Sequence, residues 1–148
     1  MNSTTTLRDA TAADWPAIEA LLVAANLPLD GARDHLGSFM IGEGDGQVRC
    51  VAGFEQYEGA ALLRSVAVAG ALRGQGLGDQ LLGAIKAKAR ARGVDTLYLL
   101  TTTAAPFFAQ RGFVPIERNA TPAALQASRE FQGVCPASAS AMAASLTV

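Results

Sequence analysis

The chain has 148 residues, half of them hydrophobic, and its 12 basic and 13 acidic side chains leave a formal net charge of −1. This length favours one domain with one core, so we expect a single domain over residues 1–148. The balanced charge predicts no nucleic-acid partner, and no uncharged apolar run reaches the roughly 18 residues of a membrane helix, so we expect no membrane partner.

The first half of the chain predicts a strand, a helix and three further strands. Thr5–Arg8 reads as a short strand, and Thr11 as the N-cap of a helix that Pro28 ends. The apolar residues at helical spacing in this segment are Trp15, Ile18, Leu21, Leu22 and Ala25. Residues 29–39 are ambiguous, and a short helix is one reading of them. The strands expected next are Phe39–Glu43, Val48–Gln56 and Ala60–Val68, separated by the turn sequences EGDGQ and EG.

The second half alternates helices and strands after a glycine-rich loop. The clearest helix is Leu77–Arg92, which Gly93 ends. Its apolar side consists of Leu77, Leu81, Leu82, Ile85 and Ala89. Later elements are a strand at Val94–Thr102, a helix at Ala105–Arg111 closed by Gly112, a strand at Phe113–Glu117, a helix capped by Thr121 and Pro122, and a strand at Ala137–Thr147. This order indicates an α/β fold with an antiparallel meander before the glycine loop.

The two cysteines and the N-terminus indicate the compartment. Cys50 lies in an apolar run and Cys135 precedes a proline, so neither has the spacing of a metal or redox site. His35 is the only histidine and completes no metal site, so we expect none. The first residues lack the charged-then-apolar plan of a signal peptide. We expect a reduced, cytoplasmic protein.

The sequence RGQGLG, residues 73–78, lies between a β-branched run and the clearest helix. A helix N-terminus presents unpaired N–H groups and a partial positive charge. Glycines before it let an anion approach the backbone, and Arg73 adds a cation. The loop therefore predicts a pyrophosphate site.

Three phosphate-binding patterns compete for this loop. The P-loop pattern fails because no lysine follows Gly78. The dinucleotide pattern G-x-G-x-x-G is met only loosely, since Asp79 occupies the position of its last glycine and the loop follows antiparallel strands. The pattern R-x-x-G-x-G is met in full by Arg73, Gly76 and Gly78. A structural glycine turn in another fold is the remaining alternative.

The stretch LLRSVAVAGALRGQGLGDQLL resembles the acetyl-CoA motif of the GNAT N-acetyltransferases, and LYLLTTTAAPFFAQRGF is similar to the strand and helix that follow it. The resemblance implies the GNAT fold, with a mixed, mostly antiparallel sheet flanked by helices. It also implies acetyl-CoA as co-substrate and an amine as acceptor. LLRSVAV, YLLTTTA and the tail REFQGVCPASASAM further resemble a bacterial subgroup associated with arsenic resistance.

The resemblance assigns the acetyl-CoA site residue by residue. The implied set is Val66, Ala67 and Val68 for the acetyl and pantetheine groups, Arg73, Gly74, Gln75, Gly76, Leu77 and Gly78 for the pyrophosphate, and Thr101, Thr102, Phe107 and Phe108 along the cleft. The alternative for both phenylalanines is a place in the core.

The catalytic residues follow less directly. Many relatives carry a tyrosine as general acid where this chain has Phe108, so another donor must serve, and Tyr98 is the nearest tyrosine. Glu55 is the candidate base, acting through a water. Its alternative is an ordinary surface carboxylate beside a turn.

Three residues are candidates for binding the acceptor. Arg64 alternates in phase with Val66 and Val68, and its fork suits a carboxylate; its alternative is an exposed sheet-face residue. Arg129 is a second carboxylate candidate. His35 lies on a segment that often lines the acceptor site in the family, although a surface histidine is the alternative reading.

These residues predict an N-acetyltransferase for a small amine, with an amino acid or an amino-acid-like toxic compound as acceptor. Two other functions stay open, a CoA-binding sensor without turnover and a protein N-acetyltransferase. The apolar tail SASAMAASLTV is a candidate for pairing with a second copy in a homodimer.

Overall fold

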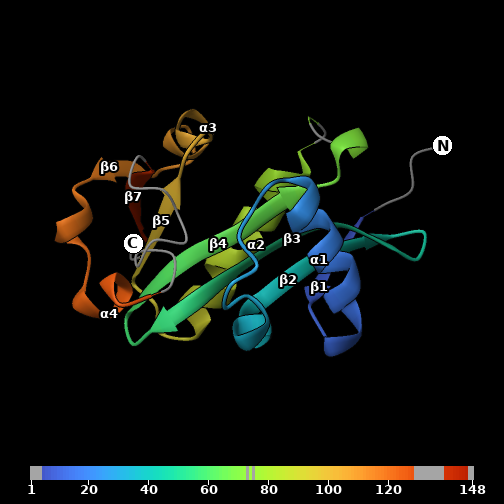
Figure 1. Ribbon diagram of the computed structural model, residues 1–148, viewed down its shortest axis with the longest axis horizontal. Coiled ribbons are helices and arrows are strands. Elements are labelled where there is room, and N and C mark those ends of the chain that lie inside the picture. The colour runs from blue at the N-terminus through green and yellow to red at the C-terminus, as the bar shows by residue number, and fades with distance from the viewer. Residues whose placement is uncertain (1–4, 73, 75, 129–138, 147–148) are drawn as a thin grey trace.

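The computed structural model describes residues 5–72, 74, 76–128 and 139–146 (Figure 1). Among these residues, seven strands form one sheet in the order β1-β2-β3-β4-β5-β7-β6. The strands are β1 (Thr6–Asp9), β2 (Phe39–Gly44), β3 (Gln47–Tyr57), β4 (Ala60–Val68), β5 (Thr96–Thr101), β6 (Val114–Ile116) and β7 (Ser140–Ser145). The α-helices are α1 (Trp15–Ala24), α2 (Leu77–Ala91), α3 (Ala105–Ala109) and α4 (Ala123–Gln126). Short 3₁₀ helices are η1 (Ala12–Asp14), η2 (Arg33–Ser38), η3 (Gly70–Leu72) and η4 (Arg118–Ala120).

The sheet is mixed and mostly antiparallel, as expected. Among the described strands, only β4 and β5 run parallel, and every other neighbouring pair is antiparallel. The turn between β2 and β3 has Asp45 and Gly46 at positive φ, which is the backbone of a tight two-residue hairpin turn. The expected order of elements is therefore confirmed over the described residues.

The helices cover both faces of the sheet, with α1 in front of it and α2 behind it in the view of Figure 1. The predicted apolar side of α2 is fully buried, and all five of its residues belong to the larger core cluster. A second cluster joins α1 to β2 and β3 through Ile18, Leu22, Phe39 and Val51. Periodicity thus located both helix–sheet interfaces.

The C-terminal part differs from its prediction in two respects. The helix after Thr121 begins with Pro122 at the N-cap, and the Thr121 hydroxyl donates to the Arg118 carbonyl instead of capping the helix (2.7 Å). The tail strand β7 lies between β5 and β6 and pairs with both. Both edges of β7 therefore have a partner strand within the chain, β6 covering Ala141–Ala143, and pairing of the tail with a second copy stays a prediction.

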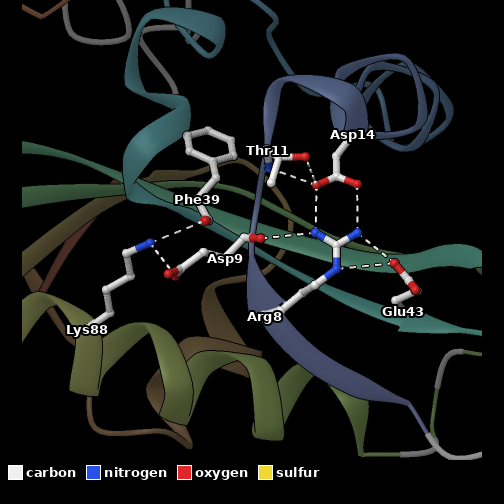
Figure 2. A network of polar contacts seen from close by, with 7 residues as sticks. All are labelled: Arg8, Asp9, Thr11, Asp14, Phe39, Glu43 and Lys88. Carbon is white, nitrogen blue, oxygen red and sulfur yellow. Dashed lines mark hydrogen bonds and ion pairs between the residues drawn. The ribbon is translucent and has the colours of Figure 1, made fainter.

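Arg8 ties the first strand to its neighbours (Figure 2). Its guanidinium donates to both oxygens of Asp14 at 2.8 Å and to Glu43 Oε2 at 2.6 Å. The backbone N–H of Thr11 also donates to Asp14 (2.7 Å). The hydrogen bonds to Asp14, of which those from Arg8 have the largest effect, hold the pKa of its carboxyl well below the ordinary value. The network fixes where β1 passes into η1 and α1.

Replacing Asp14 by asparagine should lower the free energy of unfolding at pH 7 by roughly 2 kcal/mol, because Arg8 would lose a bidentate, charge-assisted partner. Since the pKa of Asp14 is depressed, its contribution is complete above the ordinary value near 3.8 and disappears as pH falls below it. Urea unfolding at pH 7 and at pH 3 measures the free energy of unfolding of both proteins. The difference between the variant and the wild type should be smaller at pH 3. Asp9→Asn, which removes the exposed partner of Lys88, is the control and should change little.

Candidate functional site

The site is built where β4 and β5 separate. Their parallel ladder covers only Ala60–Leu62 against Thr96–Tyr98, although β4 continues to Val68 and β5 to Thr101. Figure 1 shows the two strands diverging from this short contact. A cleft of about 1090 Å³ opens here, and its walls come from β4, β5, the glycine loop with the start of α2, α3 and the segment after α1.

Most of the expected cofactor residues line this cleft. The described members of that set at its walls are Val66, Ala67, Val68, Gly74, Gly76, Leu77, Gly78, Thr101, Thr102, Phe107 and Phe108. Arg73 and Gln75 lie outside the described residues, as do Arg129 and Cys135. The residues assigned to the cofactor by resemblance therefore come from four separate elements and meet at one cavity.

The three glycines of the loop lie in two different settings. Gly74 and Gly76 have φ of 83° and 82°, a conformation that side chains rarely adopt, and a Cβ at either would meet nothing within 4 Å. Gly76 is also the N-cap of α2. Gly78 instead lies beside Phe107, and a Cβ there would make an ordinary van der Waals contact of 3.4 Å with Cζ of that ring. The loop thus leaves the first N–H groups of α2 beside open space.

The two phenylalanines of α3 belong to the cleft wall and to the core together. Phe108 is 7 % exposed and stacks edge-on against Phe107 and Phe113, with ring centroids 5.1 and 5.5 Å apart. Both Phe107 and Phe108 also line the cleft. The two readings offered by the sequence are therefore not exclusive.

Sequence reasoning missed Arg111, which lines the cleft beside α2. Its guanidinium lies 3.7 Å from the centroid of the Phe107 ring and pairs with Asp79 through Nε and Oδ1 at 2.5 Å. The pair lowers the pKa of Asp79, the acid in the first turn of α2. Arg111 thereby balances a negative charge next to the loop expected to hold an anion. From the sequence, Arg111 is identified only as the last residue of the short helix that Gly112 closes.

A bulge at Ser65 places Arg64 and Val66 on opposite faces of the sheet. The register of β3 against β4 shifts between Val51 and Gly53, and Ser65 has a φ of 61°. Arg64 consequently lies on the sheet face of Ala67 and α1, whereas Val66 packs toward α2. The expected alternation with Val66 and Val68 is wrong, because the inserted residue breaks the two-residue period.

Arg64 and Glu55 are both 3 % exposed, so neither alternative that placed them at the surface holds. Arg64 Nη1 donates to Glu55 Oε2 at 2.6 Å, and the hydroxyl of Tyr57 donates to Glu55 Oε1. His35 Nε2 lies 3.7 Å from that same oxygen. Arg64 lines the cleft, whereas Glu55 and His35 do not.

Tyr98 lies away from the cleft lining. Its ring packs against the small cluster of Ala60, Leu62 and Leu125, on the face covered by α4. The hydroxyl of Thr101, by contrast, accepts the N–H of Ala104 at 3.0 Å and so caps the turn before α3. The roles expected for Tyr98, Glu55 and His35 in the reaction stay predictions.

Comparisons with known proteins agree with this arrangement. Residues 35–115 match the family described as "Acetyltransferase (GNAT) domain". An amino-acid acetyltransferase of Azotobacter vinelandii is 39 % identical over 100 residues, which cover 66 % of this chain and 23 % of that protein. The chain therefore spans about a quarter of the length of this curated relative.

Two solved structures share the fold. N-acetylglutamate synthase from Neisseria gonorrhoeae, complexed with coenzyme A and N-acetyl-glutamate, superposes with a TM-score of 0.85 at 24 % identity, over 100 % of this chain and 36 % of that one. Rv2747 from Mycobacterium tuberculosis, in complex with CoA, gives 0.79 at 22 % identity, over 96 % and 99 % of the two chains. Among the described residues, no helix is both long and apolar enough to cross a membrane.

Proposed function

The chain belongs to the GNAT acetyltransferase family, and we propose that it transfers the acetyl group of acetyl-CoA to the amine of an amino acid or a similar small compound. The observation that carries this proposal is the cleft between β4 and β5, which runs to the glycine N-terminus of α2. We place the anion at the glycine loop and the acceptor beside residues 25–28, which line the cleft after α1.

The proposed binding mode follows the chemistry of the walls. The pyrophosphate lies against residues 73–78, where the N–H groups of the first turn of α2 and the Arg73 cation attract it. The pantetheine arm extends along residues 66–68 of β4, whose edge departs from β5. Thr101 and Thr102 border the acetyl group from the other strand. CoA supplies an activated thioester, and the chain orients it.

The reaction sets three demands on the chain. The attacking amine must lose a proton, because an alkylammonium has a pKa of about 10. The oxyanion of the tetrahedral intermediate needs donors, which the backbone of β4 supplies in our proposal. The departing thiolate needs a proton or a dipole. Glu55 is proposed to receive the amine proton only through a relay of water, since both of its oxygens already have partners.

The proposed acceptor class rests on the relatives. The relatives found by sequence include amino-acid acetyltransferases, and the chain shares its fold with an N-acetylglutamate synthase. Arg129 is proposed to contact an acceptor carboxylate, and His35 to border its entry. The resemblance to an arsenic-resistance subgroup makes an arsinic analogue of glutamate a specific acceptor to include.

The experiment that tests the proposal follows thiol release from acetyl-CoA with a panel of amines. The panel holds glutamate, other amino acids, the phosphinic and arsinic analogues of glutamate, a polyamine and an aminoglycoside. We expect release with the amino-acid class and none with the polyamine or aminoglycoside. Release with none of them, together with tight acetyl-CoA binding, would contradict the proposal and favour a sensor or a protein acceptor.

Phe108 is the observation that keeps the sensor as a second candidate, since its ring cannot donate a proton to the thiolate. Phe108→Tyr should raise kcat about tenfold, because a phenol at the cleft wall adds a general acid. Steady-state kinetics at saturating acceptor measures it. Tyr98→Phe is the paired variant and should leave kcat unchanged, because Tyr98 lies outside the cleft lining. A large loss in Tyr98→Phe would instead assign the acid to Tyr98.

A further inference from the structure

Arg64 is an arginine on the cleft wall whose side chain is nonetheless buried. Its guanidinium donates to atoms of three segments. Nη1 donates to Glu55 Oε2 at 2.6 Å and to the carbonyl of Asp30 at 2.7 Å, Nη2 donates to the carbonyl of Pro28 at 3.1 Å, and Nε donates to Ser65 Oγ at 3.1 Å. A planar fork with five N–H groups suits such simultaneous contacts.

The segments that Arg64 joins form one side of the cleft. Residues 26–28, in the loop between α1 and η2, line the cleft, and Arg64 holds this loop through the carbonyls of Pro28 and Asp30. Ser65 lies at the bulge and also lines the cleft. The loop thereby gains a fixed place beside the point where β4 leaves β5.

We propose that Arg64 is a positioning residue that fixes the loop of residues 26–30 as the acceptor-side wall, and that it does not bind the acceptor's carboxylate. This inference rests on the proposed acetyl transfer. It replaces the expectation that Arg64 binds the substrate. The ion pair with Glu55 satisfies its charge inside the protein, and the Tyr57 hydroxyl supports that carboxylate in turn.

The energetics favour the internal role. At least four of the five N–H groups of Arg64 already donate, so a two-point contact with a substrate carboxylate would require it to release Glu55, a loop carbonyl or Ser65. A carboxylate that is 3 % exposed would then lose its cationic partner, which is strongly unfavourable in a protein interior. If Arg64 instead released the carbonyls of Pro28 and Asp30, the loop that forms this wall of the cleft would lose its tether.

Steady-state kinetics with Arg64→Lys tests the proposal, using an amino-acid acceptor and the same compound as its carboxamide. A lysine keeps the charge but cannot bridge four acceptors in a plane. We expect kcat/KM for both acceptors to fall equally, by about tenfold, while KM for acetyl-CoA changes less than twofold. A loss confined to the carboxylate acceptor, or no loss at all, would overturn the proposal.

Arg49→Lys is the matched control. Arg49 is a strand arginine of β3 that pairs with Asp45 and contacts Thr5, and it is not among the residues lining the cleft. We expect its kinetics to match wild type. A tenfold fall in this control as well would mean that any lost strand arginine lowers activity, and would remove the case for Arg64.

Hydrogen exchange separates this inference from the acetyl transfer itself, because it needs no turnover. The amides of Leu27 and Ala32 are bonded to the carbonyls of Leu22 and Leu29 around the tethered loop. Arg64→Lys should speed their exchange several-fold and leave the amides of α2 unchanged. Unchanged exchange at Leu27 and Ala32 would overturn the positioning role, whether or not the wild type turns over an amine.

Discussion

Gly76→Val should weaken CoA binding by about 30- to 100-fold, as measured by titration calorimetry on the folded variant. Gly76 is the N-cap of α2 with a φ of 82°, and valine there is forced out of the left-handed region. The loop must then rotate, so that its N–H groups no longer point together at a pyrophosphate. A weakening of this size corresponds to about 2–2.7 kcal/mol, which is the cost expected for losing one hydrogen bond to a charged group.

The matched control for this prediction is Gly93→Val. Gly93 follows the other end of α2, has a φ of 86°, and a Cβ there also meets nothing within 4 Å. Both variants therefore carry the same kind of backbone strain, and their thermal midpoints should fall by similar amounts. Only Gly76→Val should lose CoA affinity. Equal affinities in the two variants would mean that the loop backbone does not hold the anion.

The sequence sufficed for the parts of the site that depend on local backbone rules. The glycine loop, the buried side of α2 and the order of elements along the chain follow from short-range patterns, whereas the cleft residues on β4 and β5 could be listed only from the resemblance to a family. Helical periodicity is a strong signal because five buried positions must agree with it.

The polar arrangement around Arg64 could be predicted only in part. The hairpin turn at Glu58 and Gly59 fixes Glu55 opposite Leu62, so Arg64 is the diagonal neighbour of Glu55 and an ion pair could have been read from the register. The bulge at Ser65 carries no such signal, since serine gives no warning of a positive φ. That one residue decides that Val66 lies on the opposite face of the sheet from Arg64.

Gly53→Ala should lower the free energy of unfolding by about 3 kcal/mol, or roughly 6–12 °C in Tm, because β3 has no room for a side chain at this position. Gly53 pairs with Phe39 on β2 and with Arg64 on β4. A Cβ at Gly53 would overlap the ring of Phe39, which is fully buried against the α1 face of the sheet. Urea unfolding with a global fit measures the change.

Gly37→Ala is the control, since a Cβ there meets nothing within 4 Å, and its stability should stay near that of wild type. The double variant Gly53→Ala/Phe39→Leu tests the cause, because a smaller side chain vacates the space that the new methyl group needs. Its loss should be at least about 1 kcal/mol smaller than the sum of the single losses. Additive losses would mean that the ring is not what excludes the methyl group.

Gly53 also matters to the site, because Phe39 and Arg64 lie on the same sheet face to either side of it. A displaced Phe39 ring would press on Arg64, which holds the acceptor-side wall in place.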